Sequence, residues 1–170
     1  MARLQQVLAV SADGYVAKGP DDDMRWTGPA DKAVFRMLTF TGNAKLGVSR
    51  RTGAMMPGLP GREVVTITRD PRTKNEMTLE QFARHNHKGW LIGGQELCMA
   101  AMNASLLSDL WVVRNDRALG PELDYRKEPG IRFALDDILK QGYEKAMTTR
   151  VQAEGREVRV DLWREVGHGW

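Results

Sequence analysis

Short apolar segments that alternate with stretches of helical periodicity most strongly constrain the fold of this chain. Leu4 to Val10 (LQQVLAV) is a strand candidate, a helical pattern follows Gly28, and Glu63 to Thr68 (EVVTIT) is a short β-branched run. A helix between successive strands is the usual connection in a parallel sheet. The order therefore predicts an α/β fold, in which flanking helices cover both faces of a central, mostly parallel twisted sheet.

The alternation continues through the next part of the chain. Its strand candidates are Ala44 to Val48, Lys88 to Ile92 and Leu110 to Val113. The capping box Thr78-Leu79-Glu80-Gln81 predicts the start of a helix that runs to about Asn86. A second helix is predicted after Gly93-Gly94, with a helical pattern that contains Leu97, Ala100, Ala101 and Leu107. Clusters of turn-forming residues predict irregular stretches between these elements, at Lys18 to Ala30 and at Gly53 with Pro57 to Arg62.

The last third of the sequence changes character. Tyr143 to Gln152 and Glu157 to Val166 are two strand-like segments around a short turn, and the second alternates apolar and polar residues. They predict an antiparallel C-terminal hairpin that closes the sheet. Because no repeat, low-complexity segment or linker interrupts the pattern, residues 1–170 are expected to form one domain.

Composition excludes several classes of protein. No window reaches the roughly 18 apolar residues of a membrane span, and the apolar run within Met1 to Val10 is too short for a signal peptide, so a cytoplasmic protein without membrane partners is expected. The formal net charge of +3 is too mild and too dispersed for a nucleic-acid binder, but it suits a small anionic ligand.

Metal and nucleophile chemistry find no support in the sequence. Cys98 is the single cysteine, which excludes an intramolecular disulfide and a thiolate metal cluster. His85 and His87 are two positions apart in a predicted helix and would face different directions. No metal site and no serine or cysteine hydrolase is therefore expected.

Asp31 is the acidic residue that most invites a functional reading. It stands in the first turn of a predicted helix, where the helix dipole alone explains an acidic residue. It also stands near Trp26 and Phe35, which would place a lone carboxylate in an apolar, aromatic cleft. Such a carboxylate can bind an amidine-like edge of a heterocycle through two hydrogen bonds.

Glycine and arginine residues at predicted strand ends suggest anion binding. Gly93-Gly94 lies where a strand gives way to a helix, so its backbone N–H groups could receive a pyrophosphate, although such a pair is often structural. Ser49-Arg50-Arg51-Thr52 offers guanidinium and hydroxyl groups at the edge where open α/β sheets bind ligands. Arg62 and Arg69 could each hold a carboxylate or phosphate, or could simply be exposed.

Taken in order, these segments resemble dihydrofolate reductase over essentially the whole chain. The ordered set is specific, and its members are the LQQVLAV strand, Met24-Arg25-Trp26, Pro29-Ala30-Asp31-Lys32-Ala33-Val34-Phe35, Ser49-Arg50-Arg51-Thr52, Leu59-Pro60-Gly61-Arg62, the EVVTIT strand, Trp90-Leu91-Ile92-Gly93-Gly94 and the C-terminal hairpin. The resemblance implies a dihydrofolate-reductase-like three-layer α/β fold and a monomer. It also implies NADPH-dependent reduction of the small-molecule substrate dihydrofolate to tetrahydrofolate, for one-carbon metabolism, and a target for antifolates.

The resemblance assigns substrate and catalytic roles position by position. Asp31 matches the acid that hydrogen-bonds the pterin and favours its protonation, and Trp26 matches the tryptophan of the closing loop. Further matches border the substrate, with Arg62 pairing the α-carboxylate of the folate tail: Val7, Ala9, Lys32, Phe35, Arg62 and Ile92.

The same resemblance assigns an NADPH site. The residues implied are Ala9 and Val16 near the nicotinamide, Arg50, Arg51, Thr52, Thr68 and Arg69 at the phosphates and adenosine, and Gly93, Gly94 and Gln95 at the pyrophosphate. No metal is implied.

The sequence departs from the family pattern at several positions. Arg25 replaces a usual proline in the active-site loop, Lys32 occupies a normally apolar position facing the benzoyl part of folate, and Ser49 replaces a usual glycine. Cys98 replaces a common tyrosine. Val113 lies near the position of a hydroxyl residue that often supports the catalytic acid, which leaves the hydrogen bonds around Asp31 open.

Two other readings stay open. Ser11-Ala12-Asp13-Gly14-Tyr15-Val16-Ala17 resembles the start of the riboflavin-pathway pyrimidinone reductases, which share this fold and use NADPH, but those enzymes lack Pro-Ala-Asp at the helix start. The departures also fit a catalytically weak reductase-like module with a structural or interaction role.

Overall fold

The computed structural model describes residues 3–40, 45–55, 59 and 61–166. Ten strands form an eight-stranded sheet, ordered β5-β4-β3-β6-β1-β7-β10-β9, and a small β2-β8 pair. The strands are β1 (Leu4–Val10), β2 (Tyr15–Ala17), β3 (Lys45–Ser49), β4 (Glu63–Ile67), β5 (Glu76–Met77), β6 (Trp90–Leu91), β7 (Leu107–Asn115), β8 (Ile131–Arg132), β9 (Tyr143–Ala153) and β10 (Arg156–Glu165). The helices are η1 (Arg25–Thr27), α1 (Gly28–Thr39), α2 (Arg50–Met55), α3 (Leu79–His85), α4 (Gln95–Asn103), η2 (Gly120–Glu122) and α5 (Asp136–Gly142).

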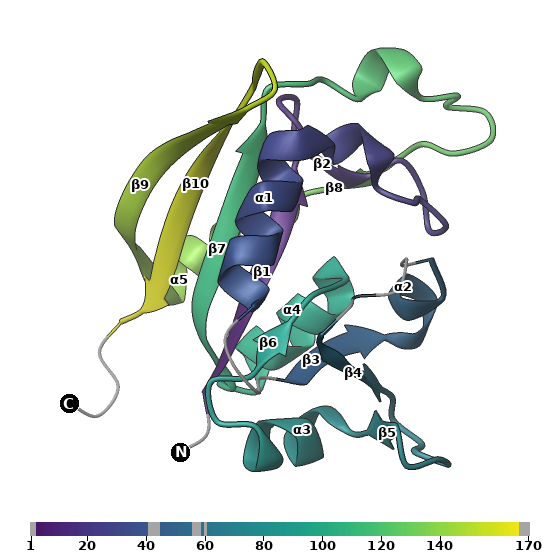
Figure 1. Ribbon diagram of the computed structural model, residues 1–170, viewed down its shortest axis with the longest axis vertical. Helices are drawn as coiled ribbons and strands as arrows, with labels where there is room; N and C mark the ends of the chain where they lie inside the picture. Colours follow the sequence, from purple (N-terminus) through teal and green to yellow (C-terminus); the bar gives the residue numbers. More distant parts are fainter. Residues whose placement is uncertain (1–2, 41–44, 56–58, 60, 167–170) are drawn as a thin grey trace.

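The large sheet is mostly parallel, as the strand–helix alternation predicted. β1 pairs in parallel with both β6 and β7, and β3 pairs in parallel with β4 and β6. The C-terminal hairpin is antiparallel: β10 joins β7 on one side and β9 on the other. Figure 1 shows this hairpin at one end of the sheet and α1 in front of the sheet, running roughly along β1 and β7.

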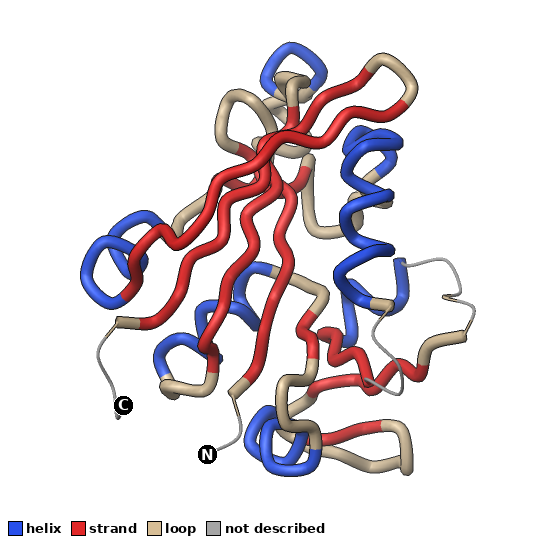
Figure 2. The backbone as a smooth tube through the Cα atoms, turned by 60° about the vertical axis from the view of Figure 1, so that its left-hand side comes forward, coloured by secondary structure: helices blue, strands red, loops and turns tan. Residues whose placement is uncertain are grey.

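Two apolar clusters give the molecule three layers. Residues of α3, α4 and α5 pack on one face of the sheet, against Leu4, Leu8 and Val10 of β1. Ala30 and Val34 of α1 pack on the other face, against Val7 of β1 and apolar residues of β3, β7 and β10. Figure 2 shows α1 on one side of the strands.

Several expected boundaries were wrong. Leu107 begins β7 rather than continuing a helix, because it pairs with Leu4 of β1. Gly53, which is expected in an irregular stretch, lies in the short helix α2, at whose start the Ser49 hydroxyl accepts a hydrogen bond from the Thr52 N–H. α3 ends at His85, so His87 lies beyond the helix.

The loop predicted from Lys18 to Ala30 is shorter than expected and contains structure. Arg25–Thr27 forms a 3₁₀ turn and α1 begins at Gly28, with Pro29 in its first turn as the sequence indicated. Ala44 and Pro60, which lie in a predicted strand and in a quoted motif, are outside the described residues.

The capping box at the start of α3 is confirmed and supports a stability prediction. The Thr78 hydroxyl accepts from the Gln81 N–H at 3.1 Å, and the Gln81 side chain accepts from the Thr78 N–H at 3.0 Å. Thr78→Ala leaves the Gln81 N–H without this partner and is expected to lower the free energy of unfolding by about 1 kcal/mol, measured by urea denaturation. Gln141→Ala, at an exposed helical position, is the control; equal effects of both changes would contradict the prediction.

Candidate active site

Asp31 is a buried carboxylate in the first turn of α1. It is 9% exposed, and its helix neighbours Ala30 and Val34 are fully or almost fully buried. Burial raises its pKa from 3.8 to about 6, while a hydrogen bond from the Thr27 hydroxyl and the charge of Lys32 act in the opposite direction. A group with this pKa exchanges a proton near neutral pH, as a general acid or base requires.

The polar groups around Asp31 come from the turn before α1. The Thr27 hydroxyl lies 3.0 Å from the Met24 carbonyl oxygen, and because it has a single proton it donates either there or to Asp31. The Lys32 ammonium donates to the Thr27 hydroxyl oxygen at 3.2 Å and to the Met24 carbonyl oxygen at 3.5 Å. Lys32 thus faces the η1 turn, and its expected place along the benzoyl part of a substrate stays a prediction.

The hydroxyl that acts on Asp31 in this structure belongs to Thr27 and not to a residue near Val113. Val113 is fully buried opposite Ala9 of β1 and offers no polar group. Nothing in the motif comparison pointed to Thr27 as a partner of Asp31. The sequence feature that could have indicated Thr27 is its position directly before the Gly28-Pro29 helix start, close to Asp31 in the chain.

Trp26 is held rigidly in η1. It is 2% exposed, packs in a cluster with Tyr15 and Leu119, and donates from Nε1 to a carboxylate oxygen of Asp22 at 2.9 Å. Asp22 also accepts from the N–H groups of Lys18 and Met24. Asp22 is therefore the hydrogen-bond acceptor around which the loop before η1 is arranged. Ala9 packs against the Trp26 cluster.

A guanidinium group lies at the opposite end of α1. Arg62 donates to the Thr39 hydroxyl at 2.8 Å, and its guanidinium carbon lies 5.9 Å from the centroid of the Phe35 ring and 5.8 Å from that of Phe40. Arg62 Nε is buried and has no partner among the described residues. Thr39 is eight residues beyond Asp31, which corresponds to about 12 Å along a helix axis.

Further residues predicted at the substrate and the cofactor lie in the apolar clusters. Val7 and Ile92, predicted at the substrate, are buried on the α1 side of the sheet, in the cluster that Phe35 joins. Val16, predicted near the nicotinamide, packs in the other cluster with Leu8 and Val10, whereas Ala9 packs against the Trp26 cluster.

The glycine pair lies against the start of α2. The Ser49 N–H donates to the Gly93 carbonyl oxygen at 3.0 Å, and the Gly93–Gly94 peptide bond is cis. A Cβ at Gly93 would lie 2.8 Å from Thr52 Cγ2, and one at Gly94 would lie 3.3 Å from Thr52 Oγ1. The backbone that follows β3 and the backbone that follows β6 therefore lie side by side. Side chains at positions 93 and 94 would fill the space between this backbone and Thr52.

Gln6, which the sequence did not single out, contacts the glycine pair from β1. It is fully buried and its Nε2 donates to the Gly94 carbonyl oxygen at 3.4 Å. A glutamine at a core-facing position of the apolar LQQVLAV strand was the signal in the sequence.

The basic residues near the glycine pair are not equivalent. Arg50 forms an ion pair with Glu76 at 2.6 Å. Arg51 and Arg69 are exposed and have no hydrogen bond or ion pair within the described part of the chain. The Thr68 hydroxyl accepts from the Asp70 N–H at 3.4 Å.

Gln95 makes two hydrogen bonds to backbone, and they occupy both ends of its side-chain amide. It donates to the Arg132 carbonyl oxygen and accepts from the Ala134 N–H, each at 2.9 Å. A contact between Gln95 and the cofactor stays a prediction, and the backbone of Gln95 would have to make it.

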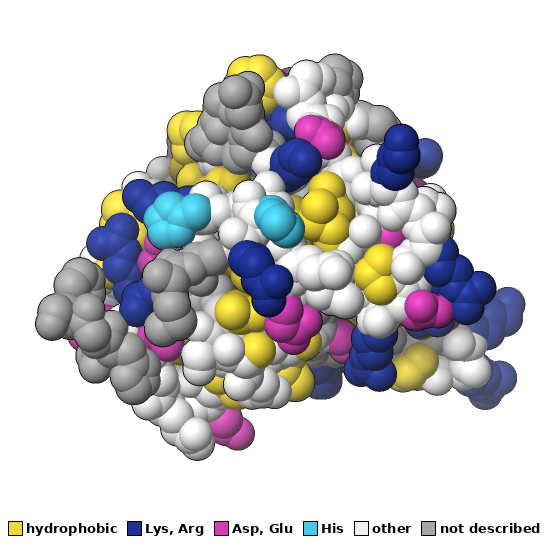
Figure 3. Space-filling view, turned by 90° about the horizontal axis from the view of Figure 1, so that it is seen from below, with side chains coloured by type: hydrophobic (Ala, Val, Ile, Leu, Met, Phe, Trp, Pro, Cys, Tyr) yellow, Lys and Arg dark blue, Asp and Glu magenta, His cyan; other side chains and the backbone are white. Residues whose placement is uncertain are grey.

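Other kinds of site are not seen in the described part of the chain. Its His, Cys, Asp and Glu residues form no group of three or more that could hold a metal ion. None of the described helices is both long and apolar enough to cross a membrane. On the face in Figure 3, basic side chains alternate with acidic and uncharged ones and form no continuous stripe.

Comparison with known proteins identifies the fold. Neither a protein-family model nor a curated protein matches this sequence. Among solved structures, the chain is similar to a dihydrofolate reductase from Enterococcus faecalis complexed with NADP(H) and RAB-propyl, with a TM-score of 0.71, 18% sequence identity and coverage of 97% of each chain. The chain therefore has the dihydrofolate-reductase-like α/β fold that the ordered motifs predicted.

Proposed function

On this fold, we propose that the protein is an NADPH-dependent reductase that converts 7,8-dihydrofolate to 5,6,7,8-tetrahydrofolate. The observation that carries the proposal is the pair of charged groups along α1: buried Asp31 at one end, and Arg62 beside Phe35 and Phe40 at the other. Dihydrofolate has the complementary shape, because its pterin presents an amidine-like edge and its tail ends in a carboxylate.

The residues present fit a dinucleotide cofactor. Gly93 and Gly94 leave backbone space beside Thr52 that a Cβ would fill, and the N–H groups at the start of α4 suit a pyrophosphate. Arg51 and Arg69, whose side chains have no partner among the described residues, are available for the remaining phosphate, whereas Arg50 is paired with Glu76. NADPH, when bound, supplies the hydride that is added to C6 of the substrate.

Asp31 performs two tasks in this proposal. As a carboxylate it accepts hydrogen bonds from the amino group and ring N–H of the pterin, which orients the ring. A carboxylate engaged at that edge cannot also touch N5, so the proton reaches N5 through water, and Asp31 favours that transfer electrostatically. The rigid Trp26 cluster and the apolar α1 side of the sheet exclude bulk water from the same region.

The test is a spectrophotometric assay of NADPH oxidation with purified protein. Dihydrofolate is compared with the pyrimidinone substrate of the riboflavin pathway, and NADPH binding is titrated in parallel. We expect oxidation with dihydrofolate. Oxidation with the pyrimidinone alone would replace the proposal with the riboflavin-pathway reductase, and absent NADPH binding would favour a structural module.

Arg62 allows a sharper test of the substrate. Arg62→Leu removes the proposed partner of the tail carboxylate, so we expect KM for dihydrofolate to rise about tenfold to a hundredfold with little change in kcat. KM for a dihydropterin that lacks the benzoyl-glutamate tail should stay at the wild-type value. Arg72→Leu, at an exposed arginine paired with Asp70, is the control. An equal rise in KM for both substrates would contradict the assigned role.

A further inference from the structure

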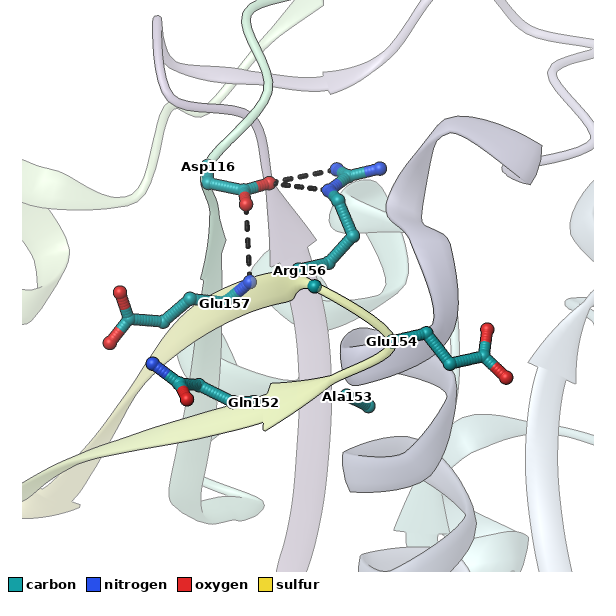
Figure 4. Close-up of a pocket in the computed structure, with 7 residues that line it drawn as sticks. Asp116, Gln152, Ala153, Glu154, Arg156 and Glu157 are labelled. Atoms are coloured by element: carbon teal, nitrogen blue, oxygen red, sulfur yellow. Dashed lines mark hydrogen bonds and ion pairs between the residues drawn. The ribbon is translucent and has the colours of Figure 1, made fainter.

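The turn between β9 and β10 lies against the start of α1, where Arg156 approaches Gly28, three residues before Asp31. Figures 1 and 2 both show the hairpin tip beside this end of the helix. A hollow of about 540 Å³ at the tip is lined by residues of the hairpin and by Asp116. Figure 4 shows the Arg156 guanidinium and the Asp116 carboxylate turned toward each other, whereas the Glu154 side chain points away from both.

Arg156 is bonded to two neighbours, Asp116 and Asn115. It donates from Nε to Asp116 Oδ1 at 2.9 Å, forms a 2.8 Å ion pair from Nη2 to the same oxygen, and donates from Nη2 to Asn115 Oδ1 at 2.7 Å. Its third nitrogen, Nη1, lies where a Cβ on Gly28 would be only 3.1 Å away. Gly28 has a φ of 76°, so both its conformation and its lack of a side chain allow the guanidinium to approach the start of α1.

Asn115 connects Arg156 to the turn that holds Asp31. It is 5% exposed, and its Nδ2 donates to the Thr27 carbonyl oxygen at 2.5 Å. Arg156 and the Arg117 N–H are both donors to Asn115 Oδ1, so they determine which end of the amide faces Thr27. Without Arg156, the amide loses the charged donor that fixes its orientation.

Thr27 is the last step of this chain of contacts, because it is the N-cap residue of α1, the helix whose first turn carries Asp31, and its hydroxyl lowers the pKa of that carboxyl. Thr27 is itself 3% exposed, so its carbonyl oxygen depends on a protein partner for its hydrogen bond. The hairpin, the end of β7 and the 3₁₀ turn before α1 are thereby joined into one network that ends at the carboxylate.

We propose that Arg156 and Asn115 are positioning residues of the site, which hold the Thr27-Gly28 junction and through it the Asp31 carboxylate. A catalytic role for these residues rests on the proposed function, but their effect on the position of Asp31 does not. Lys32 is the charged side chain that lowers the pKa of Asp31. The contacts of Arg156 are with Asn115 and the start of α1, so its effect on Asp31 is expected to pass through the Thr27-Gly28 junction.

The decisive experiment is a carbon-13 NMR titration of the aspartate carboxyl groups, with the Asp31 signal assigned from Asp31→Asn. In Arg156→Gln the Thr27 hydroxyl loses its fixed place, and because that hydroxyl lowers the pKa of Asp31, its loss should raise the pKa by about half a unit or more. Arg156→Lys keeps a charged donor and should restore the wild-type value. Gly28→Ala, which displaces the guanidinium from the other side, should raise it as well.

The matched control is Arg150→Gln, on the same hairpin, where an exposed arginine pairs with Glu157. It should leave the titration of Asp31 unchanged. An unchanged or lowered pKa in folded Arg156→Gln and Gly28→Ala, or the same rise in Arg150→Gln, would overturn the proposal. If Arg156→Gln does not fold, the comparison of Gly28→Ala with wild type decides it.

Activity adds a second, separable measurement. The pH profile of kcat/KM for dihydrofolate should move upward in Arg156→Gln by the same amount as the NMR titration. If the wild-type protein does not reduce dihydrofolate, the proposed function is wrong, and the NMR titration still decides the positioning role. If the wild type is active but neither the titration nor the profile moves, the positioning role alone is wrong.

Discussion

Asp31→Asn is expected to reduce turnover of dihydrofolate about a hundredfold to ten-thousandfold near neutral pH, while NADPH affinity stays at the wild-type value. The amide keeps the shape of the side chain but cannot carry the negative charge that favours protonation of the pterin. The comparison is made by NADPH oxidation at saturating dihydrofolate, with NADPH binding measured separately. Wild-type turnover in the variant would show that Asp31 has no catalytic role.

The same substitution should change stability in a pH-dependent way. Because burial holds the pKa of Asp31 at about 6 in the folded protein against 3.8 in the unfolded chain, ionising it costs folding free energy. The wild type therefore becomes less stable as the pH rises from about 4 to above 6, whereas the variant, which has no carboxyl group at this position, does not. The free energy of unfolding of Asp31→Asn relative to wild type should therefore increase by up to about 3 kcal/mol over that range.

Urea denaturation at several pH values measures this difference. Its pH dependence is the informative quantity, because any constant effect of the amide cancels. A stability difference that stays constant between pH 4 and 7 would contradict a buried, perturbed carboxylate at this position. If Asp31→Asn gains stability and loses turnover, Asp31 is a residue that lowers the stability of the fold and is needed for the reaction.

Gly93→Ala should give the second large effect, on the cofactor side of the site. The new Cβ would lie 2.8 Å from Thr52 Cγ2, and a φ of 149° is one that residues with a side chain rarely adopt. Either the glycine turn or the start of α2 must shift. We expect the free energy of unfolding to fall by about 2 kcal/mol and NADPH to bind about tenfold to a hundredfold more weakly.

Gly142→Ala is the matched control for this substitution. Gly142 ends α5, and a Cβ there would meet no atom within 4 Å. This change should leave NADPH affinity unaltered and stability equal or slightly higher, because alanine is the better helix former. If Gly93→Ala bound NADPH like this control, the proposed cofactor surface at β3 and β6 would be wrong.

Elements whose determinants are local were predictable from the sequence. The Thr78 capping box, the Gly28-Pro29 helix start and the alternation of Val158, Val160 and Leu162 each depend on neighbouring residues, and each has the expected structure. The ordered motifs also predicted the fold, because their spacing reflects the order of strands and helices in it.

Elements that depend on distant partners were not predictable in the same way. Leu107 belongs to a strand because β1 lies beside it, although its local pattern continues a helix. β2 and β8 are three and two residues long and exist as strands through pairing with each other. A local pattern contains no information about such a partner, since pairing energy is contributed by residues far away in the chain.

The candidate site divides along the same line. The sequence by itself determined which chemical groups are available: a lone carboxylate in a helix start, a glycine pair after a strand, and arginines at strand ends. Only the tertiary structure decided their states. Arg50 is paired with Glu76 while Arg51 is not, and Thr27 rather than a residue of β7 supports Asp31. The pKa of Asp31 is raised because packing of α1 on the sheet removes water from it, and desolvation is a property of the assembled neighbours rather than of the residue.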